Sequence, residues 1–466
     1  MKRWFAVLAL ASAPIATSCA FLLDFDDLQG GEGSAGSDGG KSCTADPECN
    51  DDNPCTEDRC DLTSNTCVND ARVVVRDGEP RTMDVAVAHR VSVVASGARY
   101  YVAAFTEDEL QTPDVPLYWL DIKTDTWTPV GSLQSASPQL NDFPPTSNAA
   151  LVVDTSGGVE VHAYVALLPD PGQPGRVYHA RMDASLAVQA AEQTDSAFNY
   201  GLGHPERMPV TWQLADNKIY GAWVSPTGSI FFHALGPLPE LTELTVDPPA
   251  EIVAPAGIGS TPALFWVSDT LHAGLPNKTP GTIPECGAGG GAWVSAQTSF
   301  IEYQNTWLAS WTRQGANKQF VSELGTFGCS DTANLCAGPP APACDPSPVR
   351  PDTRDVAAQF YRRPSEPTLL YQILAIPTVD VGGNTAALGL TLREVDTEPD
   401  GGAVKPLDER VLSTTVVGTN TAGPDWPAVA VADPEHFAVA WVEPGAQGGR
   451  QSVRLERFRV CYDNVK

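Results

Sequence analysis

The cysteines are the residues with the clearest chemical potential, and the chain has 11 of them. Five fall within a short segment that has hardly any apolar residues between them. Their spacing lacks the paired C-x2-C pattern of zinc modules, and a segment so small and polar has no core of its own. Covalent cross-links must therefore hold it together. We predict a disulfide-rich module over residues 43–70, built on Cys43, Cys49, Cys55, Cys60 and Cys67.

The N-terminal residues predict export from the cytoplasm. A short basic region at residues 2–3 precedes an apolar stretch over residues 4–16. A membrane-spanning helix needs roughly 20 apolar residues, so this stretch is too short to span and is typical of a signal peptide. We assign residues 1–18 to the signal peptide and expect no transmembrane helix elsewhere in the chain.

Residues 16–19 read A-T-S-C and resemble the lipobox of bacterial lipoproteins, although Ala16 stands where Leu is usual. The resemblance implies that Cys19 is acylated and begins the mature chain, anchoring it to the membrane. Because Ala20 follows the cysteine, the Gram-negative sorting rule implies the outer membrane. The alternative is ordinary cleavage near Ala16, which would release a secreted protein. Residues 19–42 are rich in Gly, Ser and Asp and form a flexible tether.

Cysteine arithmetic gives one further expectation. Without Cys19 ten cysteines remain, an even number, and five of them lie in the module. If all are oxidised, at least one module cysteine pairs outside it, and we expect that partner to be Cys461. The other candidate disulfide residues lie in insertions near 276–292 and 328–352: Cys286, Cys329, Cys336 and Cys344.

The module also carries acidic side chains. It resembles the short C…DDxNPCTxDxC…C segments of secreted and surface proteins of myxobacteria, which implies an architecture rather than an activity. Its carboxylates could bind calcium, but the D-x-D-x-D-G register and the spaced Glu of a calcium loop are missing. We therefore expect solvated turns and no cofactor, with calcium as the alternative. The candidate ligands are Asp51, Asp52, Asn53, Asp58 and Asp61.

A hairpin pattern recurs from about residue 84 onward. An apolar strand leads into a tight turn of residues such as Gly, Asn and Asp, and the next strand closes with a small residue and, in most cases, an aromatic one. The first three closing alanines, at 104, 163 and 222, are 59 residues apart. The closing pairs are Ala104-Phe105, Ala163-Tyr164, Ala222-Trp223, Ala273-Gly274, Ser310-Trp311, Gln372-Ile373 and Ala440-Trp441.

Near-equal spacing of hairpins favours an all-β fold, a six- or seven-bladed β-propeller over residues 71–466. Two β-sandwich domains are the alternative, since hairpins with alternating faces suit both. Residues 117–131 resemble the outer hairpin of a kelch blade, which implies that Trp127 packs between blades. Residues 177–189 have some helix propensity, but we interpret them as strand-turn-strand. Because the ends of a propeller meet, Cys461 should lie near residues 70–80.

Catalytic motifs are missing from the sequence. It has no G-x-S-x-G, no H-E-x-x-H, no GxxxxGK[ST] and no S-x-D-x-G-x-x-W box of sialidase-type propellers. His162 and His272 each stand two residues before the second member of a closing pair, where a metal pair is conceivable but a half-buried packing layer is the expected role. We therefore assign no catalytic or metal residue.

The chain has 57 acidic and 29 basic residues, a net charge of −28, which argues against a nucleic-acid partner. We expect a non-catalytic cell-envelope lipoprotein whose propeller binds an envelope protein or a glycan. The alternative is a propeller hydrolase or lyase acting on polysaccharide or peptide, and a structural envelope spacer is a second alternative.

Overall fold

The computed structural model divides into two compact units, Met1–Ala71 and Arg72–Lys466, which we call unit 1 and unit 2. No helix among the described residues is long and apolar enough to cross a membrane. The structure describes residues 41–85, 87–108, 110, 112–141, 143–168, 175–198, 209–213, 219–224, 230–235, 240–244, 263–267, 270–274, 299–303, 306–314, 320–327, 357–379, 385–395, 404–416, 424–444 and 451–465.

Unit 1 is a small antiparallel hairpin of β1 (Thr56–Asp61) and β2 (Thr66–Ala71), preceded by the 3-10 helix η1 (Asp46–Cys49). Cys60 and Cys67 face each other across the hairpin. Asp61 ends β1 and accepts hydrogen bonds from the Thr63 N–H and the Ser64 hydroxyl, which stabilises the turn. The cluster of buried side chains consists of cysteines alone.

Unit 2 is built almost entirely of antiparallel strands, as the hairpin pattern predicts. Short helical turns, α1 (Pro138–Asn141) and η4 (Tyr462–Asn464), are its described helices. Its strands are β3 (Val74–Arg76), β4 (Arg81–Val85), β5 (Val87–Ser96), β6 (Arg99–Glu107), β7 (Pro113–Asp114), β8 (Pro116–Asp121), β9 (Thr126–Ser132), β10 (Ala150–Asp154), β11 (Glu160–Leu167), β12 (Gly175–Asp183), β13 (Val188–Phe198), β14 (Val210–Gln213), β15 (Ile219–Val224), β16 (Ile230–Leu235), β17 (Glu240–Leu244), β18 (Ala263–Val267), β19 (Thr270–Gly274), β20 (Ser299–Tyr303), β21 (Thr306–Gln314), β22 (Phe320–Phe327), β23 (Ala357–Arg363), β24 (Glu366–Val379), β25 (Thr385–Val395), β26 (Val404–Val416), β27 (Asp425–Asp433), β28 (His436–Glu443) and β29 (Gln451–Val460).

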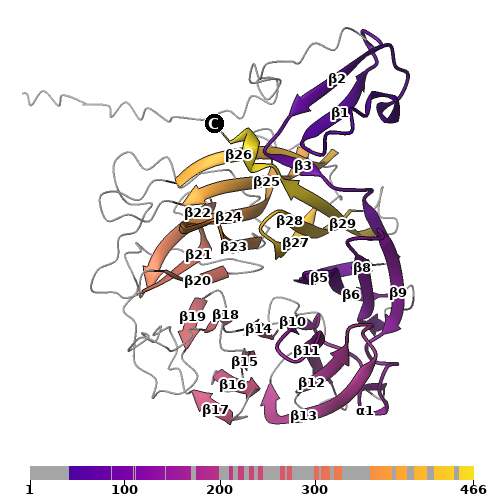
Figure 1. Cartoon of the computed structure of the whole chain (residues 1–466). Coiled ribbons are helices and arrows are strands. Elements are labelled where there is room, and N and C mark those ends of the chain that lie inside the picture. The colour runs from indigo at the N-terminus through magenta and orange to yellow at the C-terminus, as the bar shows by residue number, and fades with distance from the viewer. Residues whose placement is uncertain are drawn as a thin grey trace, which may run out of the picture. The chain divides into compact units, whose positions relative to one another are not determined.

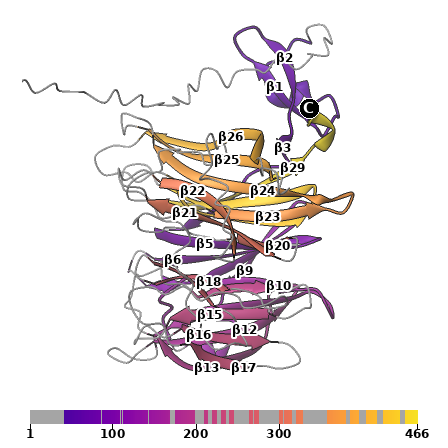
Figure 2. The ribbon, with the colours of Figure 1, turned by 90° about the vertical axis from the view of Figure 1, so that its left-hand side faces the viewer.

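These strands form successive sheets in chain order: β5–β9, β10–β13, β14–β17, β18–β19, β20–β22, β23–β26, and β27–β29 with β3 and β4. The first strands of neighbouring sheets contact one another, as in the pairs β27 and β5, β5 and β10, and β10 and β14. Figure 1 shows these first strands nearest the middle of unit 2. In the view turned by 90°, the antiparallel strands of unit 2 lie along roughly the same axis (Figure 2). This is a propeller-like arrangement.

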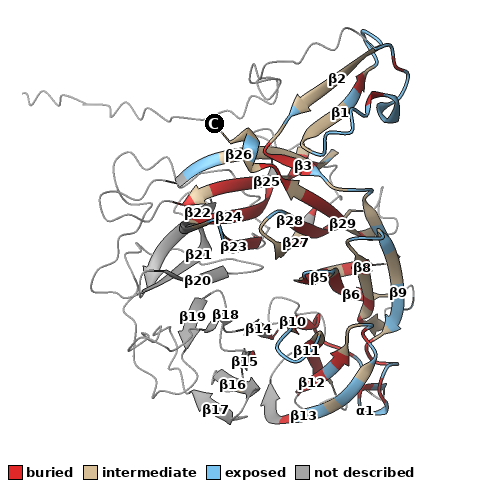
Figure 3. Cartoon of the chain, in the orientation of Figure 1, coloured by how far each residue is buried: buried red, intermediate tan, exposed pale blue. Residues whose placement is uncertain are grey.

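The hydrophobic core of unit 2 lies between neighbouring sheets, face to face. One cluster joins β5–β9 to β10–β13, a second joins β5–β9 to β27–β29, and a third joins β23–β26 to β27–β29. The closing aromatics Phe105, Tyr164 and Trp441 are among the largest fully buried side chains. Trp127 stacks on Tyr118, with ring centroids 4.8 Å apart, and packs against the second cluster. Figure 3 shows exposure rising on the outer strands β9, β13 and β26.

The sheet of β27–β29 takes its outer strands from the start of unit 2. Val460 pairs with Val74 of β3, and Gln451 pairs with Val85 of β4. The Cys461 N–H donates to the Val73 carbonyl oxygen at 2.7 Å, so Cys461 lies beside residues 70–80 as expected. Successive sheets in one compact unit do not fit the alternative of two β-sandwich domains.

Two local expectations can be compared with the structure. Residues 177–189 do form strand-turn-strand, because β12 ends at Asp183 and β13 begins at Val188. The sequence Ser365-Glu366-Pro367 indicates a turn at these residues, but the turn is displaced, since Arg363 already pairs with Glu366 and Pro367 lies inside β24. The turn is thus one step earlier than the Ser-Glu-Pro sequence indicates.

Candidate functional site

Unit 2 has long connections at one end and short turns at the other. The turns between first and second strands are short, as at residues 97–98 and 434–435. The described connection between two sheets over residues 133–149 is long. Because the strands are antiparallel, connections between sheets share the end at which each first strand begins. We call it the connection end, and loops of this kind commonly carry function.

Two adjacent first strands are irregular at the connection end. The register of β5 against β6 shifts between Ala88 and Arg90, and that of β27 against β28 shifts between Asp425 and Ala428. The Ala88 N–H instead donates to Gln451 Oε1 at 2.8 Å. Bulges redirect side chains and are frequent beside active sites. Here they direct residues of two different sheets toward each other.

The side chains brought together are those of Arg90 and Trp426. The Arg90 guanidinium carbon lies 5.1 Å from the centroid of the Trp426 ring, within the range of a cation–π contact. Arg90 is buried and Trp426 is partly buried. Trp426 has φ of 50°, a left-handed conformation that is uncommon for a non-glycine residue. Such strain concentrates at binding and catalytic sites.

An imidazole and a carboxylate lie at the same end of β5. His89 Nε2 is 3.4 Å from Glu107 Oε1, and the His89 ring packs on Phe105 with centroids 5.3 Å apart. In the part of the chain that the structure describes, no atom forms a hydrogen bond with His89 Nε2. We call His89, Arg90, Glu107 and Trp426 the axial cluster. An aromatic face, a guanidinium, a carboxylate and an imidazole suit a ligand with hydroxyl groups and an apolar face, such as a sugar.

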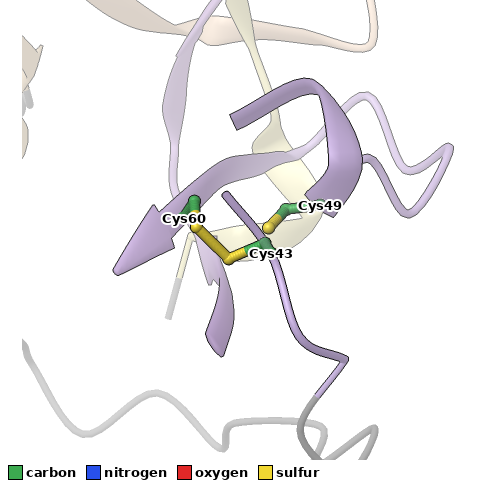
Figure 4. Close-up of side chains that lie close together, drawn as sticks. All are labelled: Cys43, Cys49 and Cys60. Atoms are coloured by element: carbon green, nitrogen blue, oxygen red, sulfur yellow. A yellow bond between two sulfur atoms is a disulfide. The ribbon is translucent and has the colours of Figure 1, made fainter. Parts of the chain in front are cut away.

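The cysteines of the module are paired. Cys43 bonds Cys60 and Cys49 bonds Cys67, and Cys55 and Cys461 are also disulfide-bonded. Figure 4 shows the sulfurs of Cys43, Cys49 and Cys60 close together. Since these sulfurs are in disulfides, they offer no thiolate to a metal. The other predicted cysteines lie outside the described residues: Cys19, Cys286, Cys329, Cys336 and Cys344.

Three of the five calcium candidates, Asp51, Asp52 and Asn53, lie in the loop before β1 of unit 1, and Asp58 lies in β1. Asp51 Oδ1 accepts hydrogen bonds from the Asn53 N–H and the Thr56 hydroxyl, both at 2.8 Å, and Asp58 Oδ2 accepts from the Asp51 N–H at 3.2 Å. Asp52 stands between them with φ of 59°. These are the bonds of turn-forming side chains. Calcium binding here stays a prediction.

The remaining candidate residues are separate. Asp61 belongs to the β1–β2 turn. Burial and the neighbouring Asp51 raise the pKa of Asp58, which shows how closely the loop carboxylates crowd together. His162 and His272 occupy the second strands of their sheets, β11 and β19, although the side chain of His272 lies outside the described residues.

The axial cluster was not found from the sequence. The alternation of apolar residues gives the strands but not a one-residue slip in register, and the slip determines where Arg90 points. One signal was present: Trp426 precedes Pro427, and a proline in a strand marks an edge or a bulge.

Comparison with known proteins gives limited information. No protein-family model and no curated protein matches the chain. Similar solved structures include a protein of unknown function from Dyadobacter fermentans DSM 18053, at 12% identity over 84% of this chain and 100% of that one, TM-score 0.45. An alpha-L-arabinofuranosidase from Fusarium graminearum is 9% identical over 82% and 98%, TM-score 0.45. The Trypanosoma rangeli sialidase is 7% identical over 86% and 57%, TM-score 0.42. Likeness this low transfers no function.

Proposed function

We propose that this protein is a cell-envelope lipoprotein whose unit 2 binds a glycan at the axial cluster. The observation that supports this most directly is the Arg90 guanidinium over the Trp426 ring, 5.1 Å from its centroid, where two bulged first strands meet. Arg90 supplies hydrogen-bond donors and Glu107 supplies acceptors for hydroxyl groups, while Trp426 supplies an aromatic face. The long connections at the same end add contacts for a polymer.

The binding test uses the purified, lipid-free protein on glycan arrays and envelope extracts. We expect Trp426→Ala to weaken binding at least tenfold, and Arg90→Lys to weaken it as well, because lysine cannot replace a stacked guanidinium. The matched control is Trp119→Phe, since Arg99 lies 4.1 Å from the Trp119 centroid near a short turn at the opposite end. Equal binding by wild type and Trp426→Ala would refute the proposal.

A hydrolase is the second candidate, favoured by the approach of His89 to Glu107. Glycoside hydrolysis uses two carboxyl groups, so Glu107 would need a partner from the connections. Incubation of the protein with envelope polysaccharides distinguishes the candidates. Release of reducing ends that Glu107→Gln abolishes would make the protein a hydrolase, whereas unchanged polymer with retained binding supports a binding protein.

The number of blades is proposed to be seven, one for each sheet of unit 2 among the described residues. The closing pairs Ala273-Gly274 and Ser310-Trp311 are 37 residues apart, an interval short for a full blade, so the sequence is compatible with six or seven blades. The sheets β18–β19 and β20–β22 are separate here, which supports seven. An experimental structure with β19 hydrogen-bonded to β20 would reduce the number to six.

The anchor and the remaining cross-link are proposals from the sequence. We expect Cys19→Ala to release the protein from the outer-membrane fraction, and continued sedimentation with membranes would show that the anchor lies elsewhere. We also expect Cys461 to bridge to the module. Peptide mapping of the oxidised protein would show that bridge directly, and a peptide joining Cys461 to a cysteine beyond residue 70 would exclude it.

A further inference from the structure

Three histidines gather between two sheets of unit 2, away from the axial cluster. His162 of β11 and His179 of β12 stack with ring centroids 5.2 Å apart, and His233 of β16 comes from the next sheet. His162 and His179 are 6% and 5% exposed. The Tyr164 hydroxyl is hydrogen-bonded to His233 Nδ1 at 2.8 Å, so His162 and His179 form a hydrogen-bonded pair of their own.

The donor and acceptor of each hydrogen bond made by His162 and His179 can be assigned in only one way. Glu192 Oε1 lies 3.2 Å from His179 Nδ1, and a carboxylate only accepts, so Nδ1 carries the hydrogen. Both rings are buried, and burial disfavours the charged form of an imidazole, so both rings are neutral at pH 7. A neutral imidazole has one N–H. His179 Nε2 therefore accepts, and His162 Nδ1 donates to it at 2.9 Å.

The chain of donors ends at a lone pair on His162 Nε2. That nitrogen is buried, and no atom of the described residues forms a hydrogen bond with it. Its neighbour is Glu160 Oε2 at 3.7 Å, which is also an acceptor. Two facing acceptors repel unless a cation or a donor lies between them. Two ligands on one tetrahedral zinc ion are about 3.3 Å apart, given bonds of about 2.0 Å. The Glu160 side chain is 47% exposed and can close the difference.

We propose that His162 Nε2 and the Glu160 carboxylate bind a divalent transition-metal cation of the zinc class. His179 and Glu192 hold the ligating ring by its second nitrogen, the outer arrangement that metal-binding histidines commonly have. Asp154 pairs with Glu160 across β10 and β11, so a second carboxylate stands beside Glu160, and its Oδ1 accepts a hydrogen bond from the Ser156 N–H. Water completes the coordination.

The charges around the site are mixed. Glu160 and Asp154 favour a cation, and both act electrostatically on His162. Arg181 pairs with His162 across β11 and β12 and opposes a cation, but it is exposed to solvent, which screens its charge. The two carboxylates against one guanidinium leave a net negative environment beside Nε2.

The test is zinc titration of the oxidised full-length protein without a tag, by calorimetry after removal of metals with a chelator. We expect His162→Ala and Glu160→Gln each to lose one equivalent of bound zinc. Glu192→Gln should weaken binding by roughly 10- to 100-fold. Cobalt substitution adds the visible absorption of a tetrahedral ion, which the same variants should lose.

The control is His436→Ala. His436 Nδ1 bonds Asp433 Oδ1 at 2.9 Å within another turn of unit 2, so its loss should leave zinc binding unchanged. Glu160→Gln removes only an exposed carboxylate, so it decides the question even where His162→Ala fails to fold. No zinc bound by the wild type, or equal binding by wild type and Glu160→Gln, would overturn the proposal and leave a bridging water at Nε2.

Discussion

Units 1 and 2 bury different kinds of side chain. In unit 1 the buried residues among those described are Cys43, Cys49 and Cys60, and two disulfides tie the segment before β1 to the two strands of the hairpin. In unit 2 large apolar side chains fill the spaces between sheets, as Trp441 does. A short polar segment cannot bury enough surface to offset its conformational entropy, so covalent bonds do what burial does in the longer unit. The two units should therefore respond to different perturbations.

The largest effect is expected from removing an aromatic side chain between sheets. Trp441 is fully buried, and its Nε1 donates to Glu443. Trp441→Ala leaves a cavity and an unpaired acceptor, so we expect unit 2 to lose about 3–5 kcal/mol of stability. Urea unfolding followed by fluorescence measures this. The disulfide-bonded peptides of unit 1 should keep their protease resistance, and their loss would contradict the comparison.

Removing a disulfide should destabilise unit 1 and leave unit 2 unchanged. The double variant Cys49→Ala, Cys67→Ala removes the bond that ties η1 to β2. We expect unit 1 to lose about 2–5 kcal/mol and to become a protease substrate. Unit 2 should unfold at the same urea concentration as in the wild type. A large downward shift of that midpoint would show that the units are not independent in stability.

A smaller effect is expected from overfilling the space between two sheets. A Cβ at Gly221 of β15 would lie 2.5 Å from Cε1 of the Tyr164 ring. Gly221→Ala forces that buried ring to move, at a cost of about 1–3 kcal/mol. Gly157→Ala is the matched control, because nothing lies within 4 Å of its added Cβ. Equal unfolding midpoints for the two variants would mean that Tyr164 does not fill this position.

The smallest effect concerns a kind of turn that occurs once in each unit. Asp183 Oδ1 accepts hydrogen bonds from the Ser185 and Ala187 N–H groups, as Asp61 does from Thr63 in unit 1. Asp183→Ala should destabilise unit 2 by about 1 kcal/mol. Asp183→Asn, which keeps an acceptor, should recover most of it. If the asparagine variant is as unstable as the alanine variant, the carboxylate charge matters more than the turn bonds.

The sequence predicted the parts of the fold that depend on local patterns. Alternating residues and turn signals located the hairpins, and the structure buries the closing aromatics Phe105 and Trp441 between sheets. The approach of Cys461 to residues 70–80 followed from closure of the last sheet. Each of these depends on neighbouring residues or on topology, which a single sequence carries.

The candidate sites could not be predicted in the same way. Arg90 and Trp426 are 336 residues apart in sequence (426 − 90), and a bulge in each strand directs them together. The sequence pairs His162 with His272 at equivalent hairpin positions, whereas its partner His179 becomes visible only when β11 and β12 are in register. Contacts between strands depend on register and bulges, and hydrophobic periodicity does not encode these.

The last sheet of unit 2 has a consequence for how the chain folds during synthesis. Its strands β3 and β4 are made first among those of unit 2, whereas their partner β29 ends at Val460. A ribosome releases the N-terminal strands long before that partner exists, and closing so long a loop is slow. Until then β3 and β4 are unpaired edges that can join another chain. A chain cut before Gln451 would stay in that state, so premature termination should yield aggregates rather than a smaller folded protein.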